Sequence, residues 1–296
     1  MTNWLLILVP ALVLPIVLLF AFTGCTLIAP LEDHNTNKDP TPAGPPPAPP
    51  PPTRPDYSAI IQGTIGLLSW WRFEEGPAFA RDYGPLGQQG AYVGVQTWVQ
   101  TGVRGSKAPE FDGKGGYVAV PFVQALNPDP TKPFSIEAWV WPGVLSPGST
   151  EEQCVLSSHD LAANGYGFKV MVIRAPNATP GFRGEVFPGR LVLPSQSVFT
   201  ASGGDPGGIW WHVVLTYDAG ASKALTLYVN ANYNPVTGSK QVTYSPNATV
   251  PLWMSADRQK VGTTPTAFFT GRIDEVAFYG TALPQATVKQ HYEAGR

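Results

Sequence analysis

The stretch Phe134-Ser135-Ile136-Glu137-Ala138-Trp139-Val140-Trp141 decides the fold class of this chain. Its apolar residues recur at every second position, so that one face carries Phe134, Ile136, Ala138 and Val140. Because successive side chains of a β-strand point to opposite faces, this spacing predicts a strand with one face in a core. Trp139 and Trp141 fall on the opposite face.

Other segments extend the same pattern. A hairpin is predicted by two apolar runs joined by a turn, Trp211-His212-Val213-Val214-Leu215-Thr216-Tyr217-Asp218 and Leu225-Thr226-Leu227-Tyr228-Val229-Asn230. Gly271–Tyr279 predicts a further strand. Leu283–Tyr292 has helical spacing with Pro284 near its start, and it is the only helix that we expect.

The composition favours an all-β protein. Charged residues make up 14% of the 296 residues, while 31 glycines and 32 prolines supply many turns. Many short strands without interposed helices predict an antiparallel sandwich or barrel. A net charge of -2 and the lack of any basic run exclude nucleic acid as an expected partner.

The amino terminus predicts export. From Trp4 to Phe22 every residue is apolar, which is long enough to cross a bilayer. The next residues, Phe22-Thr23-Gly24-Cys25, resemble the lipobox of bacterial lipoproteins, which implies a lipid on Cys25 after cleavage. The alternative is an uncleaved signal anchor with Cys25 incidental. Both readings place the rest of the chain in the cell envelope, attached to a membrane and facing the periplasm or the exterior.

Three regions follow from this pattern: residues 1–25 as a signal peptide or membrane anchor, 26–56 as a linker and 57–296 as one folded domain. Between Asp39 and Asp56 the linker is dominated by proline. Such a segment favours an extended polyproline helix of about 3.1 Å per residue. We therefore expect a spacer that holds the domain away from the membrane.

Five segments, in order, resemble the laminin G-like, concanavalin A-like jelly-roll family. They are Ser69–Gly76 with Arg81–Pro85, Gly102–Val118, Phe134–Trp141, Trp211–Asn230 and Gly271–Val276 with its trailing helix. One departure is Asn230-Ala231-Asn232, where the family commonly has Asp or Asn followed by Gly. The resemblance implies a two-sheet antiparallel jelly roll, with a hairpin turn altered at Ala231.

The same resemblance implies recognition rather than catalysis. Members are mostly binding or adhesive modules for carbohydrate or for another protein, and many bind one calcium ion. For calcium, the resemblance points to Asp82 and Asp274. The alternative for each is structural: Asp274 would bond to neighbouring backbone and Asp82 would cap a loop. The expected partner is a glycan or an extracellular protein.

Residues for catalysis are sparse. The doublets Glu74-Glu75, Glu151-Glu152 and Asp274-Glu275 would point to opposite faces of a strand, so they cannot form the facing acid pair of a glycosidase. Only Glu110 and Asp112 have the required spacing. The four histidines are isolated, and Cys154 lies in an apolar run typical of a buried thiol. We expect no enzyme activity.

The sequence does not identify the ligand-binding residues. Trp139, Trp141, Trp98 and Trp253 are candidates for stacking against a sugar, although aromatic residues of a sandwich are more often part of the core. Three functions are carried forward. They are a binding module, a structural or assembly protein of the envelope, and a glycan-cleaving enzyme. A groove with one or two rings and polar neighbours would favour glycan binding, and a large apolar patch would favour assembly.

Overall fold

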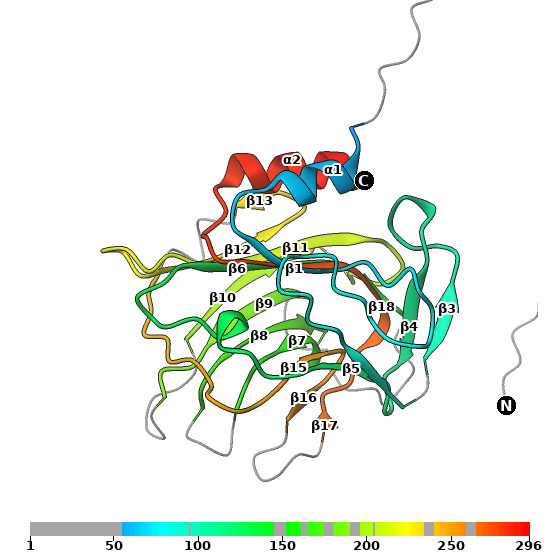
Figure 1. Ribbon diagram of the computed structural model, residues 1–296, viewed down its shortest axis with the longest axis horizontal. Coiled ribbons are helices and arrows are strands. Elements are labelled where there is room, and N and C mark those ends of the chain that lie inside the picture. The colour runs from blue at the N-terminus through cyan, green and yellow to red at the C-terminus, as the bar shows by residue number, and fades with distance from the viewer. Residues whose placement is uncertain are drawn as a thin grey trace, which may run out of the picture. The chain divides into compact units, whose positions relative to one another are not determined.

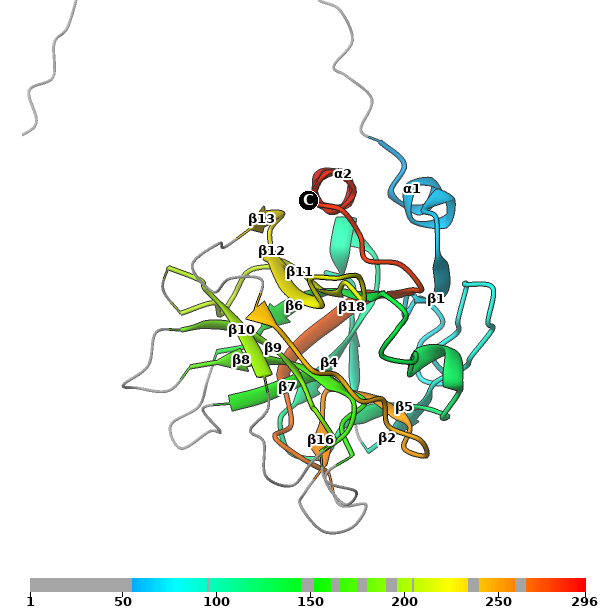
Figure 2. The ribbon, with the colours of Figure 1, turned by 90° about the vertical axis from the view of Figure 1, so that its left-hand side faces the viewer.

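A computed structural model describes residues 55–94, 96–144, 152–160, 165–174, 180–189, 196–203, 205–233, 240–258 and 265–296. Two antiparallel β-sheets pack face to face, and two helices lie on the outer side of one sheet (Figures 1 and 2). Residues Pro52–Arg296 form one compact unit, which contains both sheets and both helices. The core therefore lies entirely within this unit. This architecture confirms the predicted two-sheet jelly roll.

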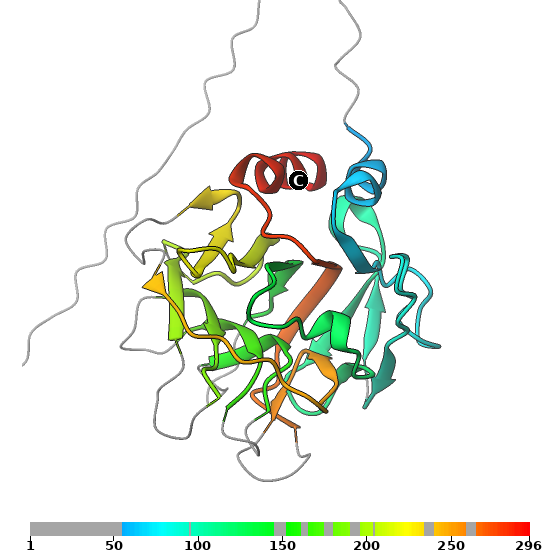
Figure 3. The same cartoon turned by 60° about the vertical axis from the view of Figure 1, so that its left-hand side comes forward.

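The first sheet has nine strands, and its central path runs β13-β12-β11-β6-β18-β4-β3, with β1 paired to β18 and β14 paired to β12. Its strands are β1 (Leu67–Trp71), β3 (Thr97–Val99), β4 (Ala108–Asp112), β6 (Phe134–Pro142), β11 (Trp211–Tyr217), β12 (Ala224–Val229), β13 (Asn232–Tyr233), β14 (Lys240–Gln241) and β18 (Thr270–Tyr279). Figure 3 shows β3 and β4 on one side of the molecule and β12 on the other.

The second sheet has seven strands in the order β10-β9-β8-β7-β15-β5-β2. They are β2 (Ala91–Val93), β5 (Tyr117–Val120), β7 (Glu152–Ser157), β8 (Phe168–Ile173), β9 (Gly181–Val186), β10 (Gln196–Ala201) and β15 (Leu252–Met254). A short hairpin of β16 (Asp257–Arg258) and β17 (Pro265–Thr266) follows β15, and the 3-10 turns η1 (Val103–Gly105) and η2 (Gln124–Leu126) lie in connections.

The predicted strands have the predicted faces. Phe134, Ile136, Ala138 and Val140 of β6 point into the core between the sheets, as do Val213, Leu215 and Tyr217 of β11. The hairpin of β11 and β12 also forms, with Leu215 opposite Leu227. Burial of this alternating apolar face stabilises the fold by about 25 cal/mol for each Å² of apolar surface removed from water. This gain in free energy is the reason why the period of two in the sequence folds into a sheet.

Helix α2 (Gln285–Gly295) confirms the predicted C-terminal helix, but it is not the only one. Helix α1 (Tyr57–Gly63) was not expected, and it begins at Asp56, whose side chain accepts a hydrogen bond from the Ser58 amide. Seven residues are too few for a helix that is stable by itself. Packing supplies the stability, because Tyr57 and Ile61 of α1 are buried with Val288 of α2 on the outer face of the nine-stranded sheet.

Candidate functional site

The predicted residue Asp82 holds a loop in place. Its Oδ1 accepts hydrogen bonds from the amides of Trp70 and Gly84, and its Oδ2 accepts one from the Gln88 amide, each at 2.7 Å. The side chain is buried. These three bonds connect the loop after β1 back to the strand itself, as expected for the structural role of this residue.

The second predicted calcium ligand, Asp274, is bonded to a different segment. Its Oδ2 accepts hydrogen bonds from the Val103 amide at 2.8 Å and from the Ser106 hydroxyl at 3.0 Å, and its Oδ1 accepts one from the Glu275 amide at 2.8 Å. Burial, followed by the neighbouring charge of Glu275, raises the pKa of Asp274 well above its ordinary value. This carboxyl group is thus bonded to the turn η1.

These arrangements do not fit a calcium site as they stand. Calcium requires six to eight oxygen ligands, and a cation at either carboxylate would compete with N–H and O–H donors that already occupy both oxygens. Within the described ranges, no group of three or more His, Cys, Asp or Glu residues is arranged to hold a metal ion. Calcium binding by Asp82 and Asp274 stays a prediction, and Cys25 lies outside the described residues.

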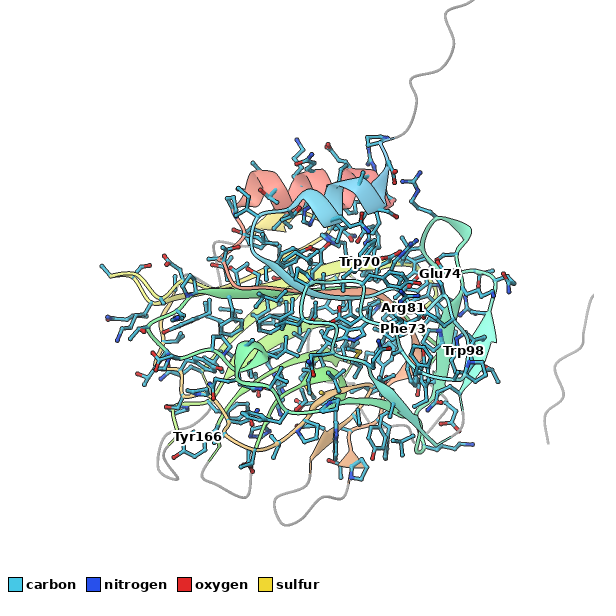
Figure 4. All side chains as sticks on the ribbon, viewed as in Figure 1. Trp70, Phe73, Glu74, Arg81, Trp98 and Tyr166 are labelled. Atoms are coloured by element: carbon cyan, nitrogen blue, oxygen red, sulfur yellow. The ribbon has the colours of Figure 1, made fainter. Side chains whose placement is uncertain are left out.

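The four candidate tryptophans have different surroundings. Trp139 is buried beneath α2, where its ring stacks on Tyr292 at a centroid distance of 6.0 Å. Trp253 is also buried, next to Tyr117. Trp98, on the edge strand β3, packs edge-on against Tyr92, and Figure 4 places it at the opposite end of the domain from Tyr166. Trp141 is half-buried and lines a groove.

We call this hollow the Trp141 groove. It has a volume of about 480 Å³ and lies on the outer face of the nine-stranded sheet, and it is lined in part by Thr97, Glu110, Asp112, Trp141, Val144 and Thr270. The register across β3, β4, β18 and β6 explains why these residues meet. Thr97 lies opposite Glu110, Glu110 opposite Arg272, and Arg272 opposite Trp141.

Arg272 holds the Trp141 ring in place. Its guanidinium lies over the indole at 4.1 Å from the ring centroid, a cation–π contact. Its Nε and Nη2 donate to Glu110 Oε1 at 3.1 and 3.0 Å, and its Nη1 donates to the Thr101 hydroxyl at 2.8 Å. The groove therefore combines an aromatic ring in a fixed position with carboxylate and hydroxyl groups.

The hydrogen bonds of Arg272 also affect Glu110 and Asp112, the one pair of acids whose spacing in the sequence suits a glycosidase. Glu110 and Asp112 both line the groove, as their spacing predicts. Glu110, however, receives two hydrogen bonds from Arg272, whereas Asp112 accepts one from the Lys114 amide of its own turn. Glycosidases need one carboxyl group that is protonated and free to act on the leaving group. Glu110 is instead held as the partner of a permanently charged guanidinium.

A second group of charges lies on the outer face of the seven-stranded sheet. Lys169 of β8 places its Nζ 3.2 Å from Asp257 Oδ2 and 3.4 Å from Glu185 Oε2. Glu185 also pairs with Arg183, which in turn pairs with Glu152. We call these five residues the Lys169 cluster. It joins β7, β8 and β9 to the start of the β16–β17 hairpin.

Sequence reasoning missed the Lys169 cluster, which brings together three acids far apart in the chain, Glu152, Glu185 and Asp257. The only signal was that Lys169 and Glu185 stand opposite each other on paired strands, and this requires the register to be known. Burial opposes ionisation of Asp257, but the hydrogen bond from His159 and the charge of Lys169 lower its pKa below the ordinary value. A general acid needs a raised pKa, so this cluster has the chemistry of an ion-pair network.

One carboxyl group does have a pKa near neutrality. Glu275 lines a small polar pocket of about 270 Å³, and its backbone is left-handed, with φ of 51°. Burial raises the pKa of Glu275 to about 7 against the lowering effects of Arg72 and of the hydrogen bond from Trp70. Trp70 Nε1 donates to Glu275 Oε2 at 2.7 Å, and the Arg72 Nε lies 3.6 Å from Oε1. Asp56, which caps α1, also lines this pocket, and its side chain accepts a hydrogen bond from the Ser58 amide.

Among the described residues, neither helix is long and apolar enough to span a bilayer. The apolar run from Trp4 to Phe22 lies outside them. Export and membrane attachment therefore stay predictions.

Solved structures with the same fold include several binding domains. The binding domain of Paraclostridial Mosquitocidal Protein 1 matches at 16% identity with a TM-score of 0.56, over 77% of this chain and 52% of that one. The binding domain of botulinum neurotoxin DC, solved with rat synaptotagmin II, matches at 10% identity with a TM-score of 0.58, over 78% and 52%. This chain thus spans about half the length of these toxin domains.

Another similar structure is domain 4 of AbnA, a GH43 extracellular arabinanase from Geobacillus stearothermophilus, in complex with arabinotriose. It matches at 16% identity with a TM-score of 0.51, over 77% of this chain and 98% of that domain. At such identities the likeness concerns the fold. No curated protein sequence matches this chain. A family model described as the concanavalin A-like lectin/glucanases superfamily matches residues 112–289, and the chain belongs to this family.

Proposed function

We propose that this chain is an exported, membrane-tethered binding module that recognises carbohydrate through the Trp141 groove and has no catalytic activity. The groove supports the proposal because it presents an indole ring, held from one side by Arg272, beside acceptor groups for sugar hydroxyls. Structural neighbours add support, since they are binding domains of toxins and a module of a glycosidase solved with arabinotriose.

The tether belongs to the same proposal. An apolar segment from Trp4 to Phe22, a lipobox-like end at Cys25 and a proline-rich linker would carry the domain outward and hold it away from the membrane surface. Metabolic labelling with a fatty-acid analogue tests this part. The full chain should be labelled, the Cys25→Ser variant should not, and labelling of that variant would contradict lipidation at Cys25.

A protein partner is the second candidate, and one observation favours it. A larger groove of about 710 Å³ lies between α1 and α2, lined largely by apolar groups of residues such as Ile60, Leu283 and Pro284. Ile65, at its edge, is 85% exposed. An exposed apolar groove of this kind is typical of protein docking surfaces.

The deciding experiment is a glycan array followed by calorimetry on residues 52–296, the compact unit that carries its own core. We expect saturable binding to a set of glycans, weakened about tenfold or more by Trp141→Ala. The matched control is Phe79→Ala, which removes an exposed ring outside the groove and should leave affinity unchanged.

Two outcomes would contradict the proposal. Glycan binding that is insensitive to Trp141→Ala would place the site elsewhere. Silence of the wild-type domain across the array, with its thermal transition intact, would leave a protein partner at the α1–α2 groove as the better explanation.

A further inference from the structure

The groups that line the Trp141 groove mostly accept hydrogen bonds. Glu110 and Asp112 bring carboxylate oxygens, which accept hydrogen bonds. The hydroxyl groups of Thr97 and Thr270 can donate, and Thr270 Oγ1 already accepts a bond from the Gln153 side chain at 3.2 Å. A ligand that fits these groups must therefore donate hydrogen bonds, which is what the hydroxyls of a sugar do.

The positive charge next to the groove, that of Arg272, is already paired with groups of the protein. Arg272 is the basic side chain in contact with the Trp141 ring, and its guanidinium is bonded to Glu110 from Nε and Nη2 and to Thr101 from Nη1. Its charge is thus balanced by Glu110. Within the described lining residues, Asp112 adds a second negative charge and no basic residue is present.

A ligand carboxylate or sulfate in this groove would meet like charges. Like charges a few ångströms apart repel each other, and the repulsion is stronger near a protein surface than in bulk water. A like-charge pair in a binding site acts mainly on specificity, since it rejects one class of partner while leaving a neutral analogue unaffected. Asp112 is exposed, so its charge faces whatever enters the groove.

We propose that the Trp141 groove selects neutral glycans and rejects acidic ones, with the sugar ring against Trp141 and hydroxyls donating to Asp112 and Glu110. This inference rests on the proposed function, and it names the ligand class of the same site. Its basis is the pairing of Arg272 with Glu110, which leaves Asp112 as the uncompensated charge of the lining.

Matched pairs of sugars test the selectivity. Each pair consists of a neutral oligosaccharide and the same oligosaccharide with a terminal sialic acid or a uronic acid, and calorimetry on residues 52–296 compares the two members. We expect the acidic member to bind at least tenfold more weakly than the neutral one, with the difference shrinking as salt is added.

Asp112→Lys sharpens the test, because it places a cation where the groove now has an anion. In this variant we expect the acidic member to gain at least tenfold in affinity. The control is Glu293→Lys on helix α2, an equal charge change at an exposed position outside the groove, which should change neither affinity. Asp112→Asn preserves an acceptor for the Lys114 amide and should give an intermediate result.

The outcomes separate this inference from the proposed function. Equal binding of both members by the wild type, or no response to Asp112→Lys in a variant with an unchanged thermal transition, overturns the selectivity for neutral sugars. The carbohydrate function survives that result if Trp141→Ala still weakens binding about tenfold or more. Failure of every sugar to bind overturns both.

Discussion

The carboxylate of Glu137 and the Nδ1 of His291 lie 2.8 Å apart, with both side chains fully buried between helix α2 and the nine-stranded sheet. Glu137 also accepts hydrogen bonds from Tyr279 at 3.0 Å and contacts the Nε2 of His212 at 2.7 Å. The Thr64 hydroxyl lies 2.8 Å from the Ile60 carbonyl oxygen and 2.9 Å from His291 Nε2. When this hydroxyl donates to Ile60 it accepts from Nε2, so that both ring nitrogens donate and the imidazole is protonated. The charge of Glu137, which raises the pKa of His291, favours this protonated form.

Glu137→Gln tests whether this ion pair stabilises the docking of the helices. Loss of the carboxylate leaves a buried cation without its partner, and removing one member of a buried pair typically costs about 3–5 kcal/mol. We expect the midpoint of urea unfolding of residues 52–296 to fall accordingly. Lys289→Ala is the control on the same helix, since Lys289 pairs with Glu293 at the surface and should contribute below about 1 kcal/mol. Similar small effects from both substitutions would refute a stabilising role.

The pair also predicts a pH dependence. Burial lowers the pKa of His291, but the charge of Glu137 and the hydrogen bond to it outweigh burial and raise it above 6.5. The resulting stability is complete below about pH 6.5 and is lost as the pH rises through the raised pKa. Burial opposes ionisation of Glu137, yet the charges of His291 and His212 lower its pKa below 4.5, so its contribution is lost only at acid pH.

The free energy of unfolding should therefore differ most between wild type and His291→Gln in the window from about pH 4.5 to 6.5. Urea titrations at several pH values measure this difference. A difference that grew steadily toward alkaline pH would show that His291 is neutral in the folded state.

Glu275→Gln should change the free energy of unfolding in the opposite direction to Glu137→Gln. The folded-state pKa of about 7 exceeds the ordinary 4.5, so the folded protein favours the neutral acid and loses stability as the pH rises from 4.5 through 7. Glutamine is neutral at every pH, and its side-chain oxygen can still accept from Trp70 Nε1. We expect this variant to be more stable than wild type at pH 8, by on the order of 2–3 kcal/mol, and equally stable near pH 4. A variant that is less stable at pH 8 would show that the charged form makes a stronger pair with Arg72.

The sheets were more predictable than the sites. Phe134–Trp141 appears as β6 and Leu283–Tyr292 appears as α2, because local periodicity determines which face of an element is buried. Helix α1 was missed because its stability comes from contacts with α2 and the sheet. The sequence predicted one part of the Trp141 groove, the acid pair, and missed the other, the contact between Arg272 and Trp141. Spacing placed Glu110 and Asp112 on one face, but the contact between Arg272 and Trp141 depends on the register of β18 with β6.

The turn at Ala231 gives a direct test of local strain. Asn230 and Ala231 both have positive φ, at 50° and 61°, in the two-residue turn between β12 and β13. Alanine in this left-handed conformation costs about 1–2 kcal/mol. Glycine avoids this cost, but the larger conformational entropy of the unfolded chain that contains it offsets part of the gain in stability. We expect Ala231→Gly to stabilise the domain by about 0.5–1 kcal/mol in urea unfolding. Ala221→Gly, in the turn before β12 and without a positive φ, should be neutral or destabilising. Stabilisation of equal size by both would show that the effect has another origin.

Asp82 separates the structural role of its carboxylate from the predicted calcium site. Three amide donors contact Asp82 at 2.7 Å, and hydrogen bonds to a charged group contribute about 1.5–3 kcal/mol each. Asp82→Asn retains two lone pairs but removes the charge, so we expect a loss of about 2–4 kcal/mol in unfolding free energy. Because the bonds are to backbone, the loss should be the same in excess calcium and in a chelator. If wild type is stabilised by calcium and Asp82→Asn is not, the carboxylate binds the ion, and the loop between β1 and β2 must rearrange to release it from its amide donors.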